Sequence, residues 1–233
     1  MAALTWDAEG ERLYETGVDH GVLYVLGNSG YGNGVAWNGL TGVTESPEGA
    51  DANDIYADNL KYLSLISEEN WKGTIKAYTY PTEFNECMGI GKISASTINK
   101  AFFGQQVRSK FGFSWRSRVG NDLLGDKYGY KLHIAYGLTA APSEMDHATK
   151  NDSPEATEFS WEISSIPAST TSKIYTGGGK AAANETALKP VAHIVILSTC
   201  SKIQTIENTL YGTQNTAPTL PTLSALIAML KAT

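Results

Sequence analysis

Two stretches of the sequence decide the fold: Phe111-Gly-Phe-Ser-Trp-Arg-Ser-Arg-Val119 and Tyr128-Gly-Tyr-Lys-Leu-His-Ile-Ala-Tyr136. In each of them large apolar residues alternate with smaller or polar residues, which is the period of a β-strand. The residues that join them, Gly120–Lys127, are typical of a hairpin loop longer than the tight two-residue type. The sequence therefore predicts an antiparallel hairpin here.

Other segments carry the same alternation or a short apolar run, bounded by Gly, Pro, Asn or Asp. We expect strands at His20–Leu26, Val35–Val43, Leu60–Ile66, Gly73–Tyr80, Thr157–Ile166 and Val191–Leu197. Between them lie three long irregular segments, which we expect to be loops: Thr44–Asn59, Ala140–Pro154 and the Gly-rich Ala168–Pro190. The chain is therefore predicted to be mainly β.

Helical periodicity is confined to a few short places. Thr82–Cys87 follows Pro81 and has room for one or two turns. Pro221–Leu230 starts with a proline suited to a first helical turn. The segment Ser201–Tyr211 ends just before a glycine, as helices often do. Its apolar residues fall at helical spacing and are expected to pack on the sheet: Ile203, Ile206 and Leu210.

Composition limits the class of protein. The chain has 233 residues, with 18 basic and 24 acidic side chains and a formal net charge of −6. A hydrophobic share of 42% with a charged share of 18% excludes disorder throughout, because disorder needs few apolar and many charged residues. We expect one domain over residues 1–233. Few charges and many Thr, Ser, Gly and Tyr residues favour a β-protein whose surface is covered by oligomerisation.

The termini, cysteines and charge exclude several environments and ligands. Neither a signal peptide nor a membrane span is predicted, because no basic start precedes an apolar segment and no apolar run approaches 18 residues. Cys87 and Cys200 are too few for a disulfide scaffold, and we expect two free thiols. The acidic balance argues against tight binding to nucleic-acid phosphates.

Two glycine- or acid-rich segments imitate ligand-binding loops without completing them. Gly27–Gly34 lacks the Lys and the Ser or Thr that end a phosphate loop. A calcium loop starting at Asp51 would need Gly at Tyr56 and Glu at Tyr62. No Gly-x-Ser-x-Gly motif occurs either. We therefore expect no cofactor and no catalytic residues, and the chain is not predicted to be an enzyme.

Histidines give no local support for a metal site. A zinc site is usually signalled by His or Cys residues three to five positions apart, and no histidine of this chain has such a neighbour. The four histidines are His20, His133, His147 and His193. His133 and His193 lie within strand patterns and are expected to be hydrogen-bonded structural residues. The sequence thus predicts no metal site.

Several strings resemble the major tail proteins, or tail tube proteins, of long-tailed bacteriophages. They span about residues 10 to 165 and keep the family's order. Besides the two strings that open this section, with the first extended to Asp122, they are Gly34-Val-Ala-Trp-Asn-Gly-Leu-Thr-Gly-Val-Thr-Glu-Ser-Pro-Glu-Gly49, Asp54-Ile-Tyr-Ala-Asp-Asn-Leu-Lys-Tyr-Leu63, Ile75-Lys-Ala-Tyr-Thr-Tyr-Pro-Thr-Glu-Phe84, Asn151-Asp-Ser-Pro-Glu-Ala156 and Phe159-Ser-Trp-Glu162. Ala168–Pro190 departs from the family pattern.

The resemblance implies a tail-tube-type β-sandwich or barrel with a flanking α-helix and a second, short C-terminal helix. It further implies a virion protein, assembled in the host cytoplasm, whose hexameric rings stack into a tube. The tube would enclose a tape measure protein, join tail terminator and tail tip proteins, and later pass double-stranded DNA without sequence-specific binding. Neither a membrane nor a cofactor takes part. Relatives of this pattern come mainly from non-contractile tails.

In this family each subunit contributes strands to a continuous inner barrel. Our candidates for the bore-lining sheet are Val35–Val43, Leu60–Ile66, Phe111–Val119 and Tyr128–Tyr136. A positive bore would hold DNA, so the basic residues of these strands should be paired with carboxylates or lie at subunit seams. They are Arg116, Arg118 and Lys131.

The family also implies a role for the acidic loop Thr44–Asn59, which lies between two of these strands. In tail tube proteins such a connection reaches the neighbouring ring. We expect this loop to be disordered in the monomer, with Ile55 and Tyr56 as its apolar anchor in the tube. Its five carboxylates should meet basic residues or line the bore: Glu45, Glu48, Asp51, Asp54 and Asp58. A solvated, mobile loop is the alternative.

Two other functions stay open. A β-sandwich glycoside hydrolase would use two of the scattered carboxylates, and a deep cleft would favour it. A carbohydrate-binding module would expose Trp71, Tyr78 or Trp161 as a platform for a glycan.

Overall fold

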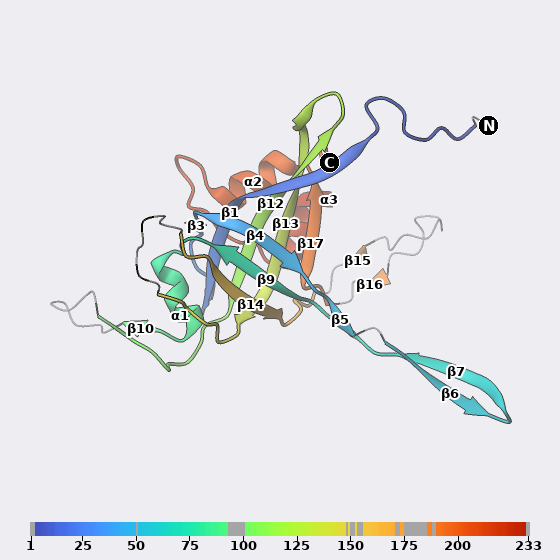
Figure 1. The fold of residues 1–233 in the computed structure, drawn as a ribbon, viewed down its shortest axis with the longest axis horizontal. Coiled ribbons are helices and arrows are strands. Elements are labelled where there is room, and N and C mark those ends of the chain that lie inside the picture. The colour runs from blue at the N-terminus through green and yellow to red at the C-terminus, as the bar shows by residue number, and fades with distance from the viewer. Residues whose placement is uncertain are drawn as a thin grey trace.

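The computed structural model describes residues 3–49, 51–92, 101–147, 149, 152, 156–170, 173–174, 186–187 and 190–231. Its largest element is an antiparallel sheet of nine strands, and the fold is mainly β, as predicted (Figure 1). The sheet comprises β1 (Leu13–Gly27), β2 (Gly30–Tyr31), β3 (Val35–Trp37), β4 (Leu40–Glu45), β9 (Lys72–Ala77), β12 (Phe111–Asn121), β13 (Gly125–Ala140), β14 (Phe159–Ser165) and β17 (His193–Leu197).

The remaining elements are short. Two-stranded pairs are formed by β5 (Glu48–Gly49) with β8 (Glu69–Asn70), β6 (Ala52–Ala57) with β7 (Leu60–Ile66), β10 (Gly91–Lys92) with β11 (Phe102–Phe103), and β15 (Lys173–Ile174) with β16 (Thr186–Ala187). The helical elements are the 3₁₀ turn η1 (Thr82–Phe84), α1 (Asn85–Met88), α2 (Ile203–Tyr211) and α3 (Leu223–Lys231).

Strand β13 organises the sheet. It pairs with β12 along most of its length, while its opposite edge pairs first with β17 and then, beyond Gly137, with β14. The order β2-β1-β12-β13-β14-β9-β4 continues from there, and β3 adds to the outer edge of β1. Within the described residues the sheet does not close into a barrel, since β4 contacts β1 without pairing to it.

An inner core lies between the β1–β12–β13 part of the sheet and the β14–β9–β4 part. The alternation predicted for β12 is confirmed, because Phe111, Phe113 and Trp115 all point into this core and are buried. Trp161 and Ile163 of β14 meet them from the other side. Aromatic rings pack edge to face here, as aromatic pairs prefer.

A second core covers the opposite face of β12 and β13. Leu132, Ile134 and Tyr136 of β13 point into it, and helices α2 and α3 cover them. The prediction for α2 is confirmed: Ile206 and Leu210 are fully buried, and Ile203 packs at the margin. The Tyr24 hydroxyl donates a 2.7 Å hydrogen bond to the Leu210 carbonyl, which ties the helix end to β1.

Several predicted strands differ in extent or partner. His20–Leu26 is part of a longer strand, β1, which begins at Leu13. Val35–Val43 is interrupted after Trp37, because Gly39 has a φ of +73°, so β3 joins β1 while β4 joins β9. Leu60–Ile66 is a strand, but it pairs outside the main sheet with β6. The loop predicted over Thr44–Asn59 is also wrong: it contains the end of β4, β5 and β6. In the local hairpin, the backbone N–H and C=O groups of this polar segment form cross-strand hydrogen bonds.

Residues 141–147 carry neither helix nor strand, as predicted, while much of 148–155 and most of 168–190 lie outside the described residues. Cys87 and Cys200 are free thiols, as expected, and burial raises the pKa of Cys87 to about 12. In the described part of the chain, each helix is too short or too polar to cross a membrane.

Candidate assembly surfaces

A two-stranded hairpin, which we call the arm (residues 52–66), projects from the body at the lower right of Figure 1. Its tip is a two-residue turn, Asp58-Asn59, between the paired residues Ala57 and Leu60. Both turn residues have positive φ, +49° and +63°. Such a turn matches the right-handed twist of the strands, and Asp and Asn tolerate this conformation well. The arm is thus formed by local sequence.

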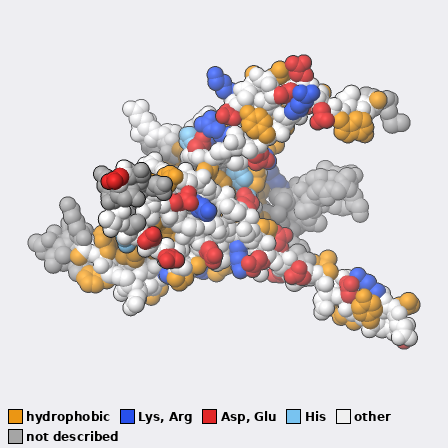
Figure 2. Space-filling model, in the orientation of Figure 1, with side chains coloured by type: hydrophobic (Ala, Val, Ile, Leu, Met, Phe, Trp, Pro, Cys, Tyr) orange, Lys and Arg blue, Asp and Glu red, His pale blue; other side chains and the backbone are white. Residues whose placement is uncertain are grey.

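The arm is exceptionally apolar for an exposed hairpin. Figure 2 shows hydrophobic side chains along it, mixed with charges. Seven large apolar side chains are 37–72% exposed, namely Ile55, Tyr56, Leu60, Tyr62, Leu63, Leu65 and Ile66. They lie on both faces, because the pair Ile55–Leu63 points opposite to Ile66. An isolated two-stranded hairpin is marginally stable in water, so this surface is suited to being covered by another molecule.

Five acidic residues of this region were predicted to meet basic residues or line the bore, and three of them, Glu45, Glu48 and Asp54, find basic partners within the chain. Asp54 forms a 2.7 Å ion pair with Lys61 across the arm and accepts a hydrogen bond from Ser64. These contacts hold the pKa of Asp54 below its ordinary value. At the root of the arm, Glu48 pairs with Lys72 at 2.5 Å.

Glu45, the last residue of β4, meets two histidines. Its Oε1 lies 3.4 Å from Nδ1 of His133, and its Oε2 lies 3.3 Å from Nδ1 of His193. The hydrogen bond to His133 is the largest influence on the pKa of Glu45 and lowers it. Burial lowers the pKa of His193 and favours its neutral form. Sequence spacing missed this group because its members come from three strands.

Ser117 extends this group, since its Oγ lies 2.9 Å from Nε2 of His133. Serine, histidine and carboxylate thus follow in the order of a hydrolase triad. Catalysis of that kind also needs unpaired backbone N–H groups beside the serine to bind an oxyanion. Here β12 is paired on both edges, with Val18 of β1 and Lys131 of β13 opposite Ser117. The geometry gives acyl transfer no support.

A second protrusion combines the distal halves of β12 and β13 with the start of β1, and we call it the ribbon (Leu13–Asp19, Arg116–Asn121 and Gly125–Lys131). Leu13 pairs with Asn121 and Tyr14 with Gly120. The Asp122 carboxylate accepts a 3.0 Å hydrogen bond from the backbone N–H of Gly10. The ribbon therefore has a third strand, which the arm lacks, and a hydrogen bond that joins its tip to the segment before β1.

The ribbon also carries the basic residues that were predicted to be paired. Arg116 contacts Asp19 at 3.0 Å and Glu207 of α2 at 3.3 Å. Arg118 binds the same aspartate at 2.8 Å, and Lys131 pairs with Glu15. The prediction that these three cations meet carboxylates is confirmed within a single chain.

The assignment of bore-lining strands needs correction. The central parts of β12 and β13 are buried on both faces, by the inner core on one side and by α2 and α3 on the other. They offer no polar face to a bore, and β7 belongs to the arm. The described strands that remain open are edges, such as β17, where Val195 and Leu197 are about half exposed. An open edge is a site for pairing with another sheet.

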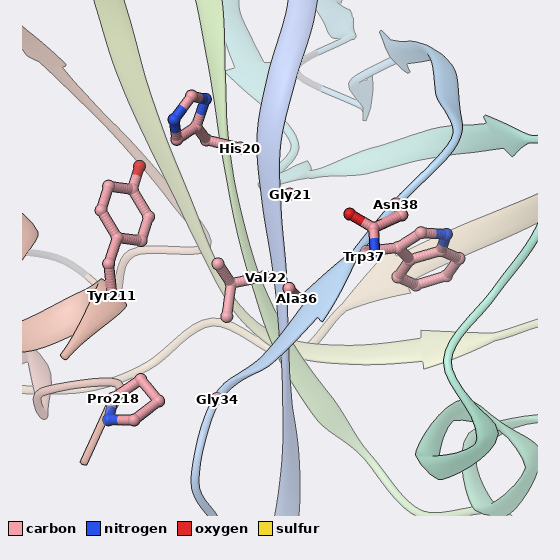
Figure 3. A pocket seen from close by; sticks show the side chains of 9 residues that line it. All are labelled: His20, Gly21, Val22, Gly34, Ala36, Trp37, Asn38, Tyr211 and Pro218. Atoms are coloured by element: carbon pink, nitrogen blue, oxygen red, sulfur yellow. The ribbon is translucent and has the colours of Figure 1, made fainter.

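An open pocket of about 500 Å³ lies between β1, β3 and the end of α2 (Figure 3). His20 and Tyr211 flank it, and Val22, Trp37 and Pro218 supply apolar walls. None of the described residues that line it is a carboxylate, so it gives no support to a glycoside hydrolase. A glycan platform is weakened as well, because Trp71 and Trp161 are buried and only Tyr78 of the three is exposed.

No protein-family model and no curated protein matched the chain.

Proposed function

We propose that the chain is a structural subunit of the tail tube of a long-tailed bacteriophage, and that it acts by self-association without catalysis. The observation that carries the proposal is the arm. Its seven exposed apolar side chains need a cover, and a second copy of the chain is the cover that a repeating tube supplies.

The energies agree with a repeating rather than a single contact. Burying one large apolar side chain fully is worth about 1.5–3 kcal/mol. Because the arm's side chains are already partly covered, burying all seven would yield about 6–12 kcal/mol. Association costs roughly 4–15 kcal/mol in lost translational and rotational freedom. The arm contact alone would therefore be weak, and ring closure together with pairing of open edges such as β17 would have to add to it.

In this proposal six copies form a ring, and arms join each ring to the next. The tube would enclose a tape measure protein, end at tail terminator and tail tip proteins, and release double-stranded DNA through its bore. The chain would reside in the virion after assembly in the host cytoplasm.

Electron microscopy of the purified chain tests the proposal directly. We expect rings or tubes with six-fold symmetry. A variant in which residues 52–66 are replaced by Asn-Gly should fold, with the near-ultraviolet circular dichroism of the core tryptophans unchanged, yet form no tubes.

A matched control removes apolar area from the tip of the other protrusion. Leu123→Ser with Leu124→Ser takes away two exposed leucines there and should leave tube formation intact. Tubes of normal length from the armless variant, or a wild-type chain that stays monomeric at high concentration, would count against the proposal.

A further inference from the structure

Three potential metal ligands converge where the arm joins the body. Glu45 ends β4, His133 lies in the middle of β13, and His193 begins β17. One donor atom from each can be chosen so that all three lie within 4.8 Å of one another. Nδ1 of His133 is 3.1 Å from Nε2 of His193 and 3.4 Å from the Glu45 carboxylate.

The two separations from Nδ1 of His133, 3.1 and 3.4 Å, are close to those between the ligands of a small divalent ion, and the third pair of donor atoms lies within 4.8 Å. Two ligands bound at about 2.0–2.1 Å to a tetrahedral zinc ion lie about 3.3–3.4 Å apart. Two imidazoles with one carboxylate form a known zinc ligand set, in which the fourth position is open to water. Glu45 is the most exposed member, so the open position would face solvent on its side.

The surroundings hold the imidazoles in place. Trp115 stacks on both of them, with ring planes within 9° and centroids 4.9 and 5.4 Å away. The Ser117 Oγ, at 2.9 Å, can accept the N–H of Nε2 of His133. That hydrogen bond would leave the lone pair of Nδ1 directed at the cluster, which is how second partners orient metal-binding histidines.

We propose that Glu45, His133 and His193 bind one divalent transition-metal ion of the zinc type. The ion would join the end of β4 to β13 and β17, and so fix the direction in which the arm leaves the body. This departs from the sequence expectation of no metal site, which rested on local spacing alone. The proposal does not depend on tube formation, because binding is measured per chain whatever the oligomeric state.

The test uses the full chain, stripped with a chelator and dialysed. Titration with Zn²⁺ by calorimetry should give one equivalent per chain, and Co²⁺ should produce the strong visible absorption of a tetrahedral site. Glu45→Gln and His193→Gln should each abolish stoichiometric binding. Ser117→Ala should weaken it about 10–100-fold, as loss of such a second partner does.

The matched control is His20→Gln. His20 also contacts a carboxylate, Asp19, at 2.7 Å, but it does not belong to the cluster. This variant should bind Zn²⁺ like the wild type. If His193→Gln fails to fold, Glu45→Gln decides, because that side chain lies at a partly exposed strand end.

Two outcomes would overturn the proposal. One is a wild-type protein that takes up no Zn²⁺ or Co²⁺. In that case Glu45, His133 and His193 are only hydrogen-bonded to one another. The other is undiminished binding by Glu45→Gln, which would place the ion elsewhere.

Discussion

The arm and the ribbon are both long antiparallel protrusions, yet they differ in how many strands pair in them and in how their side chains are covered. The ribbon gains a third strand from β1, and Tyr14 packs over Gly120 at its edge. The arm has two strands and a single cross-strand ion pair, Asp54–Lys61. Its apolar side chains lie on both faces, whereas Arg118 and Lys131 of the ribbon are paired with carboxylates of the same chain.

The difference indicates separate tasks for the two protrusions. A protrusion completed by its own chain is part of the folded unit and shares its stability. The ribbon also exposes apolar side chains, namely Leu13, Tyr14, Leu123, Leu124 and Tyr128, but its third strand joins it to the folded unit. The arm has only two strands, so it depends more on a partner, and its local free energy of opening should be small. The predictions that follow separate these two cases, in order of decreasing effect.

The largest effect comes from placing the same charge on a covered and on an uncovered isoleucine. Ile206→Asp would bury an unpaired carboxylate in the second core, at a cost of several kcal/mol against a total stability of about 5–15 kcal/mol. We expect no soluble folded protein. Ile66→Asp on the arm should keep the wild-type melting temperature and lose tube formation. Equal melting temperatures for both variants would show that α2 does not cover the sheet.

Removing residues 1–16 would turn the ribbon into a two-stranded hairpin like the arm. Each lost ladder hydrogen bond contributes about 0.5–1.5 kcal/mol, so we expect the free energy of unfolding to fall by about 2–4 kcal/mol in urea titrations. Removing only residues 1–6 keeps the Gly10–Asp122 contact and should change stability little. Equal losses in the two truncations would contradict a stabilising role for β1.

Acid should act on the ribbon and not on the arm. Burial would raise the pKa of Asp19, but hydrogen bonds from Arg116 and contact with His20 lower it overall. Because the folded pKa is depressed, this contribution is present above the unfolded value near 3.9 and is lost as the pH falls below it. Asp19→Asn should lower the free energy of unfolding at pH 7 by roughly 1 kcal/mol. The loss of stability between about pH 5 and pH 2 should then be less steep than in the wild type.

Asp54→Asn is the matched control on the arm. The pKa of Asp54 is also lowered, but its ion pair with Lys61 lies on the two-stranded arm, so this variant should leave the acid dependence of global unfolding unchanged. A steeper change in this variant than in Asp19→Asn would reverse the assignment of the two regions.

The smallest effect is confined to the turn of the arm. Asn59→Val places a β-branched residue at a φ of +63°, which costs about 1–2 kcal/mol locally. Amide hydrogen exchange in β6 and β7 should accelerate while the global melting temperature stays constant. Asn59→Gly, which suits this turn, should slow the exchange. A fall in global melting temperature with Asn59→Val would mean that the arm is coupled to the body.

Much of the sheet could be predicted because period-two alternation reports burial on opposite faces. β12, β13 and β14 carry it clearly, and the apolar spacing of α2 located Ile206 and Leu210. The alternation of β12 and β13 was misread in one respect. Their second faces were predicted to line a bore, yet α2 and α3 cover them. No local pattern shows which distant helix covers a strand.

The arm and the histidine cluster were missed for two different reasons. For the arm, the signal was present: Asp58-Asn59 between two runs of strand-forming residues is a two-residue hairpin turn. The five acidic residues of this segment instead led to the prediction of a polar loop. For the cluster, Glu45, His133 and His193 are far apart in sequence, so only the pairing of β13 with β17 brings the histidines together.

The pairing of β1 with β12 sets an order of events during synthesis. Leu13 pairs with Asn121, which is synthesised about a hundred residues later. At 5–20 residues per second, this pairing is delayed by about 5–20 s. The arm needs only its own turn, and a hairpin closes within about 1–10 μs of leaving the ribosome. The arm can therefore form well before the sheet that carries it is complete. Neighbouring chains on one messenger RNA would meet through their arms first.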